Sequence, residues 1–195
     1  MARGVLIAFE GLDQSGKQTQ AERLRDYCHG RGRRVHLLSF PDYTTPIGGE
    51  IGLALRGQRA FGPDVMQLLY VANRHERKPE IVDALRSGDV VICDRYIASS
   101  VAYGEAQGLD GVWMREIQRF LPPPHLTVLL DIEPGVSAQR KTTDRDEFER
   151  DLALLERVRA SYLGQAGAGW LRLDASATRD DVSRQILTAV EPLLS

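Results

Sequence analysis

The sequence has few of the features that mark a secreted, membrane or nucleic-acid-binding protein. Its two cysteines, Cys28 and Cys93, cannot form a disulfide framework, and Cys93 lies in an apolar run typical of a buried thiol. The formal net charge of −2 leaves no overall basic field to attract nucleic acid. No apolar run approaches the length that spans a membrane, and Glu10 interrupts the first one, which argues against a signal peptide. We therefore expect a cytoplasmic protein that binds neither nucleic acid nor membrane.

The 195 residues suit one domain with a full core, and we predict a single domain over residues 1–195. Apolar runs rich in valine, isoleucine and leucine are typical of buried parallel strands, and they cover 5–9, 35–40, 90–93, 126–132 and 170–173. Segments of helical character alternate with them and cover 17–29, 47–55, 63–85, 97–107, 112–120, 134–140, 147–163 and 180–194. This alternation predicts an α/β fold of three layers, in which helices flank a five-stranded parallel sheet.

A phosphate-binding spacing follows the first predicted strand. Gly11, Gly16 and Lys17 form the pattern G-x-x-x-x-G-K, and a helix-favouring run comes next. Glycines let successive backbone N–H groups point at one anion, the helix N-terminus adds partial positive charge, and Lys17 adds a full charge. Gln18 stands where the usual pattern has a serine or threonine that ligates Mg²⁺. An ordinary strand-to-helix turn is the alternative interpretation.

A second candidate site follows the third predicted strand. Ligands of open parallel sheets bind beyond the carboxyl ends of the strands, and Asp94 and Arg95 stand at such an end. Asp94 resembles the acidic partner of a phosphate loop, which orients Mg²⁺ directly or through water. Arg95 can clamp a second phosphate with its forked guanidinium. The alternative for Asp94 is a cap on the helix that begins near Ile97.

Two further segments suit a charged nucleotide. Arg140 and Arg145 belong to a polar stretch between the fourth and fifth strands, which we predict to be a short lid over approximately 140–148 that closes over a triphosphate. A solvated loop is the alternative. Tyr70 and Arg74 are four residues apart in a predicted helix, so they share one face and can grip a nucleobase. Taken separately, an aromatic residue in a helix is more often core, and an arginine is more often surface.

These motifs occur together in one family, and the chain resembles the thymidylate kinases, which are P-loop nucleoside-monophosphate kinases. The matching motifs run in order over nearly the whole chain: Phe9-Glu10-Gly11-Leu12-Asp13 with Gly16-Lys17, Phe40-Pro41 with Pro46-Ile47-Gly48, Tyr70-Val71-Ala72-Asn73-Arg74, Asp94-Arg95-Tyr96, Ser99-Ser100-Val101-Ala102-Tyr103 and Asp174-Ala175-Ser176. The resemblance implies a P-loop NTPase fold and transfer of the γ-phosphoryl group of ATP to dTMP, with Mg²⁺ as cofactor. It also implies a homodimer that packs through helices such as 63–85.

The resemblance assigns roles to individual residues. Those implied in catalysis are Lys17, Asp94, Arg95, Arg140 and Arg145. Those implied in ATP binding are Gly11, Leu12, Asp13, Gln14, Ser15, Gly16, Lys17, Gln18, Thr19 and Ala175. Those implied in dTMP binding are Asp13, Phe40, Pro41, Tyr43, Tyr70, Arg74, Arg95, Ser100 and Tyr103. Asp94 and Asp13 would hold Mg²⁺, partly through water. Tyr70 would stack on thymine, Arg74 would bond a base carbonyl, and Tyr103 would exclude a 2′-hydroxyl.

The chain departs from the family's pattern at three places. Gln18 puts direct ligation of Mg²⁺ by the residue after Lys17 in doubt. Tyr43 stands where some members carry an arginine that meets the monophosphate. Gln14 and Ser15 occupy positions where some members place a catalytic arginine, so the predicted lid would supply it here. The alternative functions are a deoxynucleoside kinase, which needs a carboxylate base after the second strand, and a nucleotide-binding protein that no longer catalyses.

Overall fold

A computed structural model describes residues 3–140 and 151–194 of the chain, except the side chains of residues 138–140. These residues form a parallel five-stranded sheet in the order β2-β3-β1-β4-β5. Its strands are β1 (Val5–Glu10), β2 (Val35–Ser39), β3 (Val90–Asp94), β4 (Leu126–Asp131) and β5 (Trp170–Asp174). The predicted α/β fold is confirmed, and each strand begins at the expected residue and ends within one residue of the expected position.

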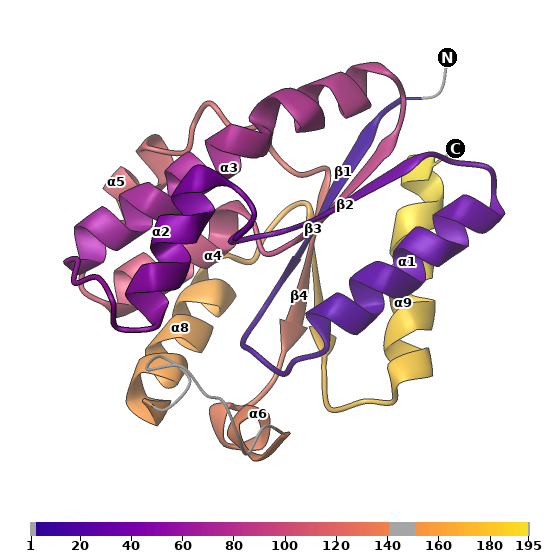
Figure 1. Cartoon of the computed structure of the whole chain (residues 1–195). Helices are drawn as coiled ribbons and strands as arrows, with labels where there is room; N and C mark the ends of the chain where they lie inside the picture. Colours follow the sequence, from indigo (N-terminus) through magenta and orange to yellow (C-terminus); the bar gives the residue numbers. More distant parts are fainter. Residues whose placement is uncertain (1–2, 141–150, 195) are drawn as a thin grey trace.

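The helices in the described part of the chain cover both faces of the sheet. They are α1 (Lys17–Gly30), α2 (Pro46–Leu55), α3 (Pro63–Arg86), α4 (Ile97–Ala106), α5 (Gly111–Glu116), α6 (Pro134–Arg140), α8 (Leu152–Gln165) and α9 (Arg179–Leu194). Figure 1 shows α1 and α9 on one side of the sheet and α3, α4 and α8 on the other. None of the helices within residues 3–140 and 151–194 is long and apolar enough to cross a membrane.

Two predicted helices have different bounds in the structure. The helix expected over 112–120 ends at Glu116, and the following residues form turns before the triproline segment 122–124, which cannot continue a helix. The helix expected from residue 147 begins at Leu152 in the structure. Asp151 caps it, because the Asp151 side chain accepts a hydrogen bond from the backbone N–H of Leu154. Residues 147–150 lie outside the described part.

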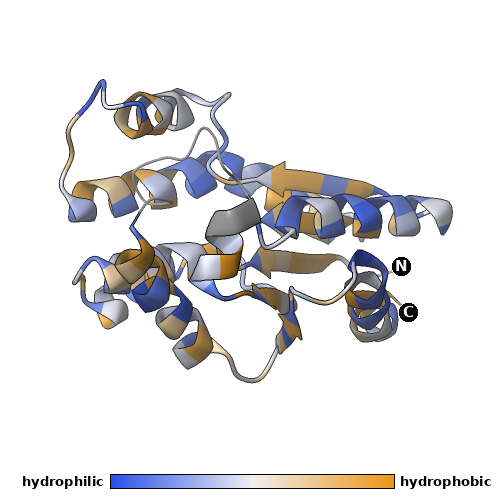
Figure 2. Ribbon diagram, turned by 90° about the horizontal axis from the view of Figure 1, so that it is seen from below, coloured by the Kyte–Doolittle hydropathy of each residue, from blue (hydrophilic) through white to orange (hydrophobic). Residues whose placement is uncertain are grey.

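The alternation of buried side chains along β1 explains the three layers. Val5, Ile7 and Phe9 belong to a core cluster that includes residues of α1, whereas Leu6 and Ala8 belong to a second cluster with residues of α3. The strands accordingly carry mostly hydrophobic residues between helices of mixed polarity (Figure 2). Strand register places Phe9 beside Asp94 and brings the carboxyl ends of all five strands to one edge. Every candidate site residue that follows a strand therefore lies on that edge.

Candidate active site

The loop between β1 and α1 has the backbone conformation that the glycine spacing predicts. Gly11 has a φ of +136°, and a Cβ atom at this position would lie 2.4 Å from the backbone oxygen of Leu130, so only glycine fits. Gly16 has a φ of +92° at the start of α1, and Gln14 has a φ of +59° between them. The loop thus curls tightly around the N-terminus of α1, where backbone N–H groups favour an anion.

Lys17 is buried beneath this loop. Its ammonium group donates a hydrogen bond to the backbone oxygen of Leu12 at 2.8 Å. Burial and the nearby charge of Arg95 lower the pKa of Lys17 to about 8, although Asp13, Asp94 and Glu10 act in the opposite direction. The pKa of Lys17 therefore lies close to neutral pH, and an added anion would favour the protonated form.

Asp13 joins the phosphate loop to the end of β3. Its Oδ1 atom lies 2.6 Å from a guanidinium nitrogen of Arg95 and 3.9 Å from the ammonium nitrogen of Lys17. Burial acts to lower the pKa of Arg95, but Asp13, Tyr103 and Tyr162 together outweigh burial, and the net pKa lies well above the usual value. Lys17 and Arg95, which follow different strands, therefore both approach one carboxylate.

A cavity opens beside Arg95, between α2, α3 and α4. Its empty space, part of which is open solvent, is about 720 Å³. Every residue that the sequence analysis assigned to dTMP lines it: Asp13, Phe40, Pro41, Tyr43, Tyr70, Arg74, Arg95, Ser100 and Tyr103. Sequence reasoning missed the lining residues Leu55, Met66, Gln67, Ser99 and Gln107. Ser99 belongs to a matching motif but was given no role. No motif marks the other four, because they come together only when α2, α3 and α4 pack.

Arg74 forms the buried floor of this cavity. Its Nη1 atom donates to the hydroxyl of Ser100 at 2.7 Å and to the backbone oxygen of Tyr70 at 3.2 Å. The Nε atom of Arg74 is buried without a hydrogen-bond partner among the residues that the structure describes. Burial lowers the pKa of Arg74. A buried donor without a partner is costly, so this guanidinium is suited to a ligand carbonyl.

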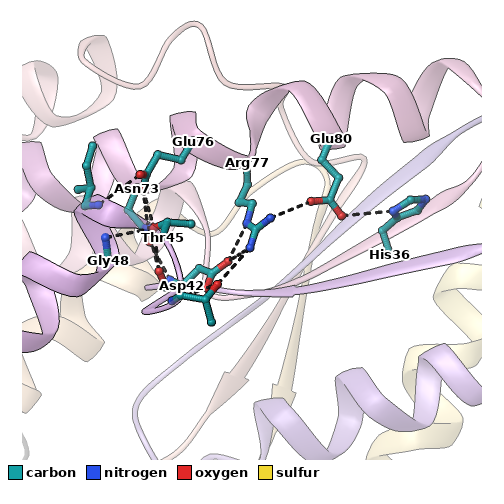
Figure 3. A network of polar contacts seen from close by, with 10 residues as sticks. His36, Asp42, Thr45, Gly48, Asn73, Glu76, Arg77 and Glu80 are labelled. Carbon is teal, nitrogen blue, oxygen red and sulfur yellow. Dashed lines mark hydrogen bonds and ion pairs between the residues drawn. The ribbon is translucent and has the colours of Figure 1, made fainter.

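A polar network outside the cavity joins two of its walls (Figure 3). The Asn73 side chain accepts from the backbone N–H of Asp42 at 2.8 Å and donates to Thr45 at 2.7 Å. Arg77 donates to the Asp42 carboxylate at 2.7 Å, and the Glu76 carboxylate accepts from Thr45 at 2.6 Å. This network, which we call the Asn73 network, ties the segment after β2, with Phe40, Pro41 and Tyr43, to the helix that carries Tyr70 and Arg74. The sequence motif Tyr70-Val71-Ala72-Asn73-Arg74 includes Asn73, but the sequence analysis gave Asn73 no role.

Other predicted residues have different surroundings. The exposed carboxamide of Gln18 donates to Glu22 at 2.9 Å, on the outer side of α1. Ala175 follows β5 at the same edge of the sheet as the phosphate loop, and its backbone N–H donates to Asp131. The side chain of Arg140 and the whole of Arg145 lie outside the described part of the chain.

The residues present fit a Mg²⁺ site that relies on few protein ligands. The Oδ1 atom of Asp94 is buried and has no hydrogen-bond partner among the described residues. Asp13, the other expected ligand, is engaged by Arg95 and Lys17. No group of three or more metal-binding side chains occurs within residues 3–140 and 151–194. Mg²⁺ in kinases is usually held by one or two carboxylates, substrate phosphates and water, so one available carboxylate oxygen is compatible with it.

The glycine loop with its lysine, the strand-end aspartate and the parallel sheet together define a P-loop nucleotide-binding fold. The family model described as thymidylate kinase matches residues 9–186. The chain is 34% identical to the thymidylate kinase of Schizosaccharomyces pombe over 194 residues, covering 96% of this chain and 92% of that protein. It is 39% identical to the probable thymidylate kinase of Pyrococcus abyssi over 170 residues, covering 83% and 82%. The structure of Candida albicans thymidylate kinase matches with a TM-score of 0.84 and 30% identity, covering 98% of this chain and 93% of that one. The chain belongs to the thymidylate kinase family.

Proposed function

We propose that this protein transfers the γ-phosphoryl group of ATP to the phosphate of dTMP, which yields dTDP and ADP. A phosphate oxygen of dTMP forms a bond to the γ-phosphorus, and the bond from that phosphorus to the oxygen bridging the β- and γ-phosphates breaks. The attacking phosphate is already ionised at neutral pH, so no general base is required. The chemistry instead needs two polyanions held in line and their charge neutralised.

One observation carries this proposal: Arg95, at the end of the cavity, and Lys17, under the phosphate loop, both approach the carboxylate of Asp13. An acceptor phosphate on Arg95 would thus lie next to a donor phosphate on Lys17. The lining of the cavity is suited to the nucleoside. Tyr70 would stack on thymine, Arg74 would donate to a base carbonyl, and Tyr103 would exclude a 2′-hydroxyl.

On the donor side, the backbone of residues 11–19 would hold the ATP phosphates, and Ala175 would lie near adenine. Asp94 would hold Mg²⁺, whose charge would offset that of the ATP phosphates when it is bound. Gln18, turned toward Glu22 in this structure, would contribute its backbone N–H more readily than its side chain. The lid arginines, Arg140 and Arg145, would supply the remaining positive charge in the transition state.

The rival function, a deoxynucleoside kinase, lacks support from the segment after β2. Asp42 is the candidate base there, but its carboxylate accepts from Arg77 at 2.7 Å and from Thr44 at 2.6 Å. It is not among the described residues that line the cavity. A carboxylate used in this way is poorly placed to take a proton from a sugar hydroxyl.

We also propose a cytoplasmic homodimer that packs through α3. Val65 and Leu68 on that helix are 39% and 45% exposed, and contact with a second copy would bury them. Cys28 and Cys93 are both free and buried, as expected of a protein from a reducing compartment. Sedimentation velocity on the wild-type protein and on Leu68→Glu would test the dimer.

A coupled assay of ADP release tests the function. The purified protein would be given ATP, Mg²⁺ and one acceptor at a time from dTMP, dUMP, dCMP, UMP and thymidine. We expect the highest kcat/KM with dTMP and a much lower value with UMP, because Tyr103 opposes a 2′-hydroxyl. Faster turnover of thymidine than of dTMP would establish the rival kinase. ATP binding without ADP release from any acceptor would indicate a binding protein that no longer catalyses.

A further inference from the structure

Glu10 is a fully buried carboxylate at the carboxyl end of β1, and the function just proposed does not use it. One of its oxygens, Oε1, accepts the backbone N–H of Tyr96 at 2.9 Å. The other, Oε2, accepts the hydroxyl of Ser99 at 2.5 Å and the hydroxyl of Tyr162 at 3.3 Å. A buried charge is tolerated only with such partners, so this side chain gathers three groups from two other segments around itself.

Arg95 lies directly over this cluster. Its Nη1 atom is 3.2 Å from the hydroxyl oxygen of Ser99 and 3.4 Å from that of Tyr162, and these two oxygens are 2.8 Å apart. The other terminal nitrogen, Nη2, faces Asp13 at 2.6 Å and the Tyr103 hydroxyl at 3.4 Å. Nη1 of Arg95 thus contacts two hydroxyls that are hydrogen-bonded to Glu10, and Nη2 lies on the side of Asp13 and Tyr103.

The backbone of Arg95 explains why such support is needed. Its φ is +65°, in the left-handed region that residues with a side chain rarely adopt. The Arg95 N–H donates to the backbone oxygen of Phe9, and the next N–H, that of Tyr96, donates to Glu10. Glu10 therefore also anchors the turn that aims the Arg95 side chain into the cleft.

The polarity of the hydroxyls depends on the charge of Glu10. A carboxylate only accepts, so the Ser99 hydroxyl donates to Glu10 and the Tyr162 hydroxyl donates to Glu10 or to Ser99. Both hydroxyl oxygens then keep lone pairs for the Arg95 guanidinium. An amide in place of the carboxylate would have one acceptor oxygen and a donor NH₂ group. It could not accept from both the Tyr96 N–H and the hydroxyls, so at least one of these contacts would be lost.

We propose that Glu10 and Tyr162 are positioning residues that hold the Arg95 guanidinium ready for the phosphate of the acceptor nucleotide. Neither side chain lines the cavity, so both act through Arg95 and Ser99. The inference rests on the proposed function only in naming dTMP as the acceptor. For Tyr162 it predicts a defect in binding the phosphate group rather than the nucleoside, because Tyr162 hydrogen-bonds to Arg95 and Ser99, whereas Arg74 hydrogen-bonds to Ser100 and Tyr70. The charge of Glu10 also acts on Arg74, so Glu10→Gln is the less selective variant.

The test compares binding of dTMP and thymidine by calorimetry, without ATP, to the wild-type protein, Tyr162→Phe and Glu10→Gln. Tyr162→Phe removes one hydroxyl and keeps the ring packed. We expect it to weaken dTMP binding about 10-fold, equivalent to about 1.4 kcal/mol, and Glu10→Gln to weaken it further. Thymidine affinity should not change in Tyr162→Phe. The matched control is Tyr27→Phe, which removes a surface hydroxyl bonded to Glu191 on the far side of the protein and should bind both ligands as the wild type does.

Equal losses of dTMP and thymidine affinity in Tyr162→Phe would show a general structural role and overturn the proposal. Unchanged dTMP affinity in Tyr162→Phe would overturn it as well. If Glu10→Gln does not fold, Tyr162→Phe decides. A wild-type protein that fails to bind dTMP would instead count against the proposed function, so the two failures are distinguishable.

Discussion

The proposed reaction has an acceptor side, which is the cavity, and a donor side, which is the phosphate loop. The two sides are built in different ways. Around the cavity, side chains from α2, α3, α4 and the segment after β2 converge, and the Asn73 network holds two of those segments together. At the phosphate loop, backbone geometry dominates: Gly11 cannot carry a side chain, and Lys17 is the main charged group. Under the proposed function, the acceptor side would discriminate between nucleotides, whereas the donor side would accept any phosphate chain. The predictions below test that division.

The largest effect is expected on the donor side, from Arg145→Ala. If Arg145 neutralises charge in the transition state, kcat should fall on the order of 10²–10³ while the KM for dTMP changes little. Steady-state kinetics with dTMP varied at saturating ATP measures both. Arg115→Ala, which removes an exposed arginine paired with Glu105, is the control. An unchanged kcat would show that Arg145 of the predicted lid does not stabilise the transition state.

The second prediction concerns pH and again the donor side. The pKa of Lys17 in the free protein is about 8, below its value of 10.5 in an unfolded chain. The cation is lost as the pH rises through 8, so kcat/KM for ATP should fall about tenfold per pH unit well above it. Bound phosphates raise the pKa of Lys17, so kcat should hold to higher pH. If kcat and kcat/KM for ATP fell over the same pH range, the loss of activity at high pH could not be assigned to Lys17.

Loss of the Lys17 proton lowers activity as the pH rises, but it has the opposite effect on the free energy of unfolding. Between pH 8 and 10.5 the unfolded chain binds the Lys17 proton and the folded protein has released it, so this group raises the free energy of unfolding as the pH increases through that window. Urea unfolding of the wild-type protein and Lys17→Met without nucleotide should differ in slope there. Below pH 8 the two slopes should agree.

On the acceptor side, Asn73→Ala should act through structure rather than chemistry. It removes the contacts to Asp42, Thr45 and Glu76, and we expect a loss of about 1–3 kcal/mol in the free energy of unfolding, together with a raised KM for dTMP. Urea denaturation and kinetics measure the two effects, with the exposed Gln58→Ala as control. Preserved KM for dTMP would mean that the Asn73 network does not shape the cavity.

The smallest effect is expected from Tyr43→Phe. Tyr43 lines the cavity but is 54% exposed, so its hydroxyl should contribute a single solvated hydrogen bond to the monophosphate. We expect the KM for dTMP to rise about threefold without a change in kcat. Tyr43→Arg should lower that KM, because it adds a cation beside Arg95. A loss of more than about tenfold in Tyr43→Phe would make Tyr43 a principal phosphate ligand.

Sequence reasoning located site residues correctly where the pattern lies in neighbouring residues, while their roles stay predictions. The phosphate loop, the strand-end pair Asp94 and Arg95, and the helical pair Tyr70 and Arg74 are each short patterns with a local physical cause. It failed for contacts between distant segments. Glu10 was noticed as a break in an apolar run and as part of a matching motif, but it was given no role, and its partner Tyr162 is 152 residues away. Gln67 and Gln107, 40 residues apart, met only in the packed structure.

The sequence alone determined the order of strands and helices, the tight glycine turn and the family, because periodicity and glycine spacing act over a few residues. The tertiary structure decided which side chains share a cavity and how its charges are balanced. Lys17 and Arg95 acquire their perturbed pKa values only when β1 and β3 lie side by side and exclude water. Electrostatic interactions depend on distance and burial, and neither quantity can be obtained from the sequence alone.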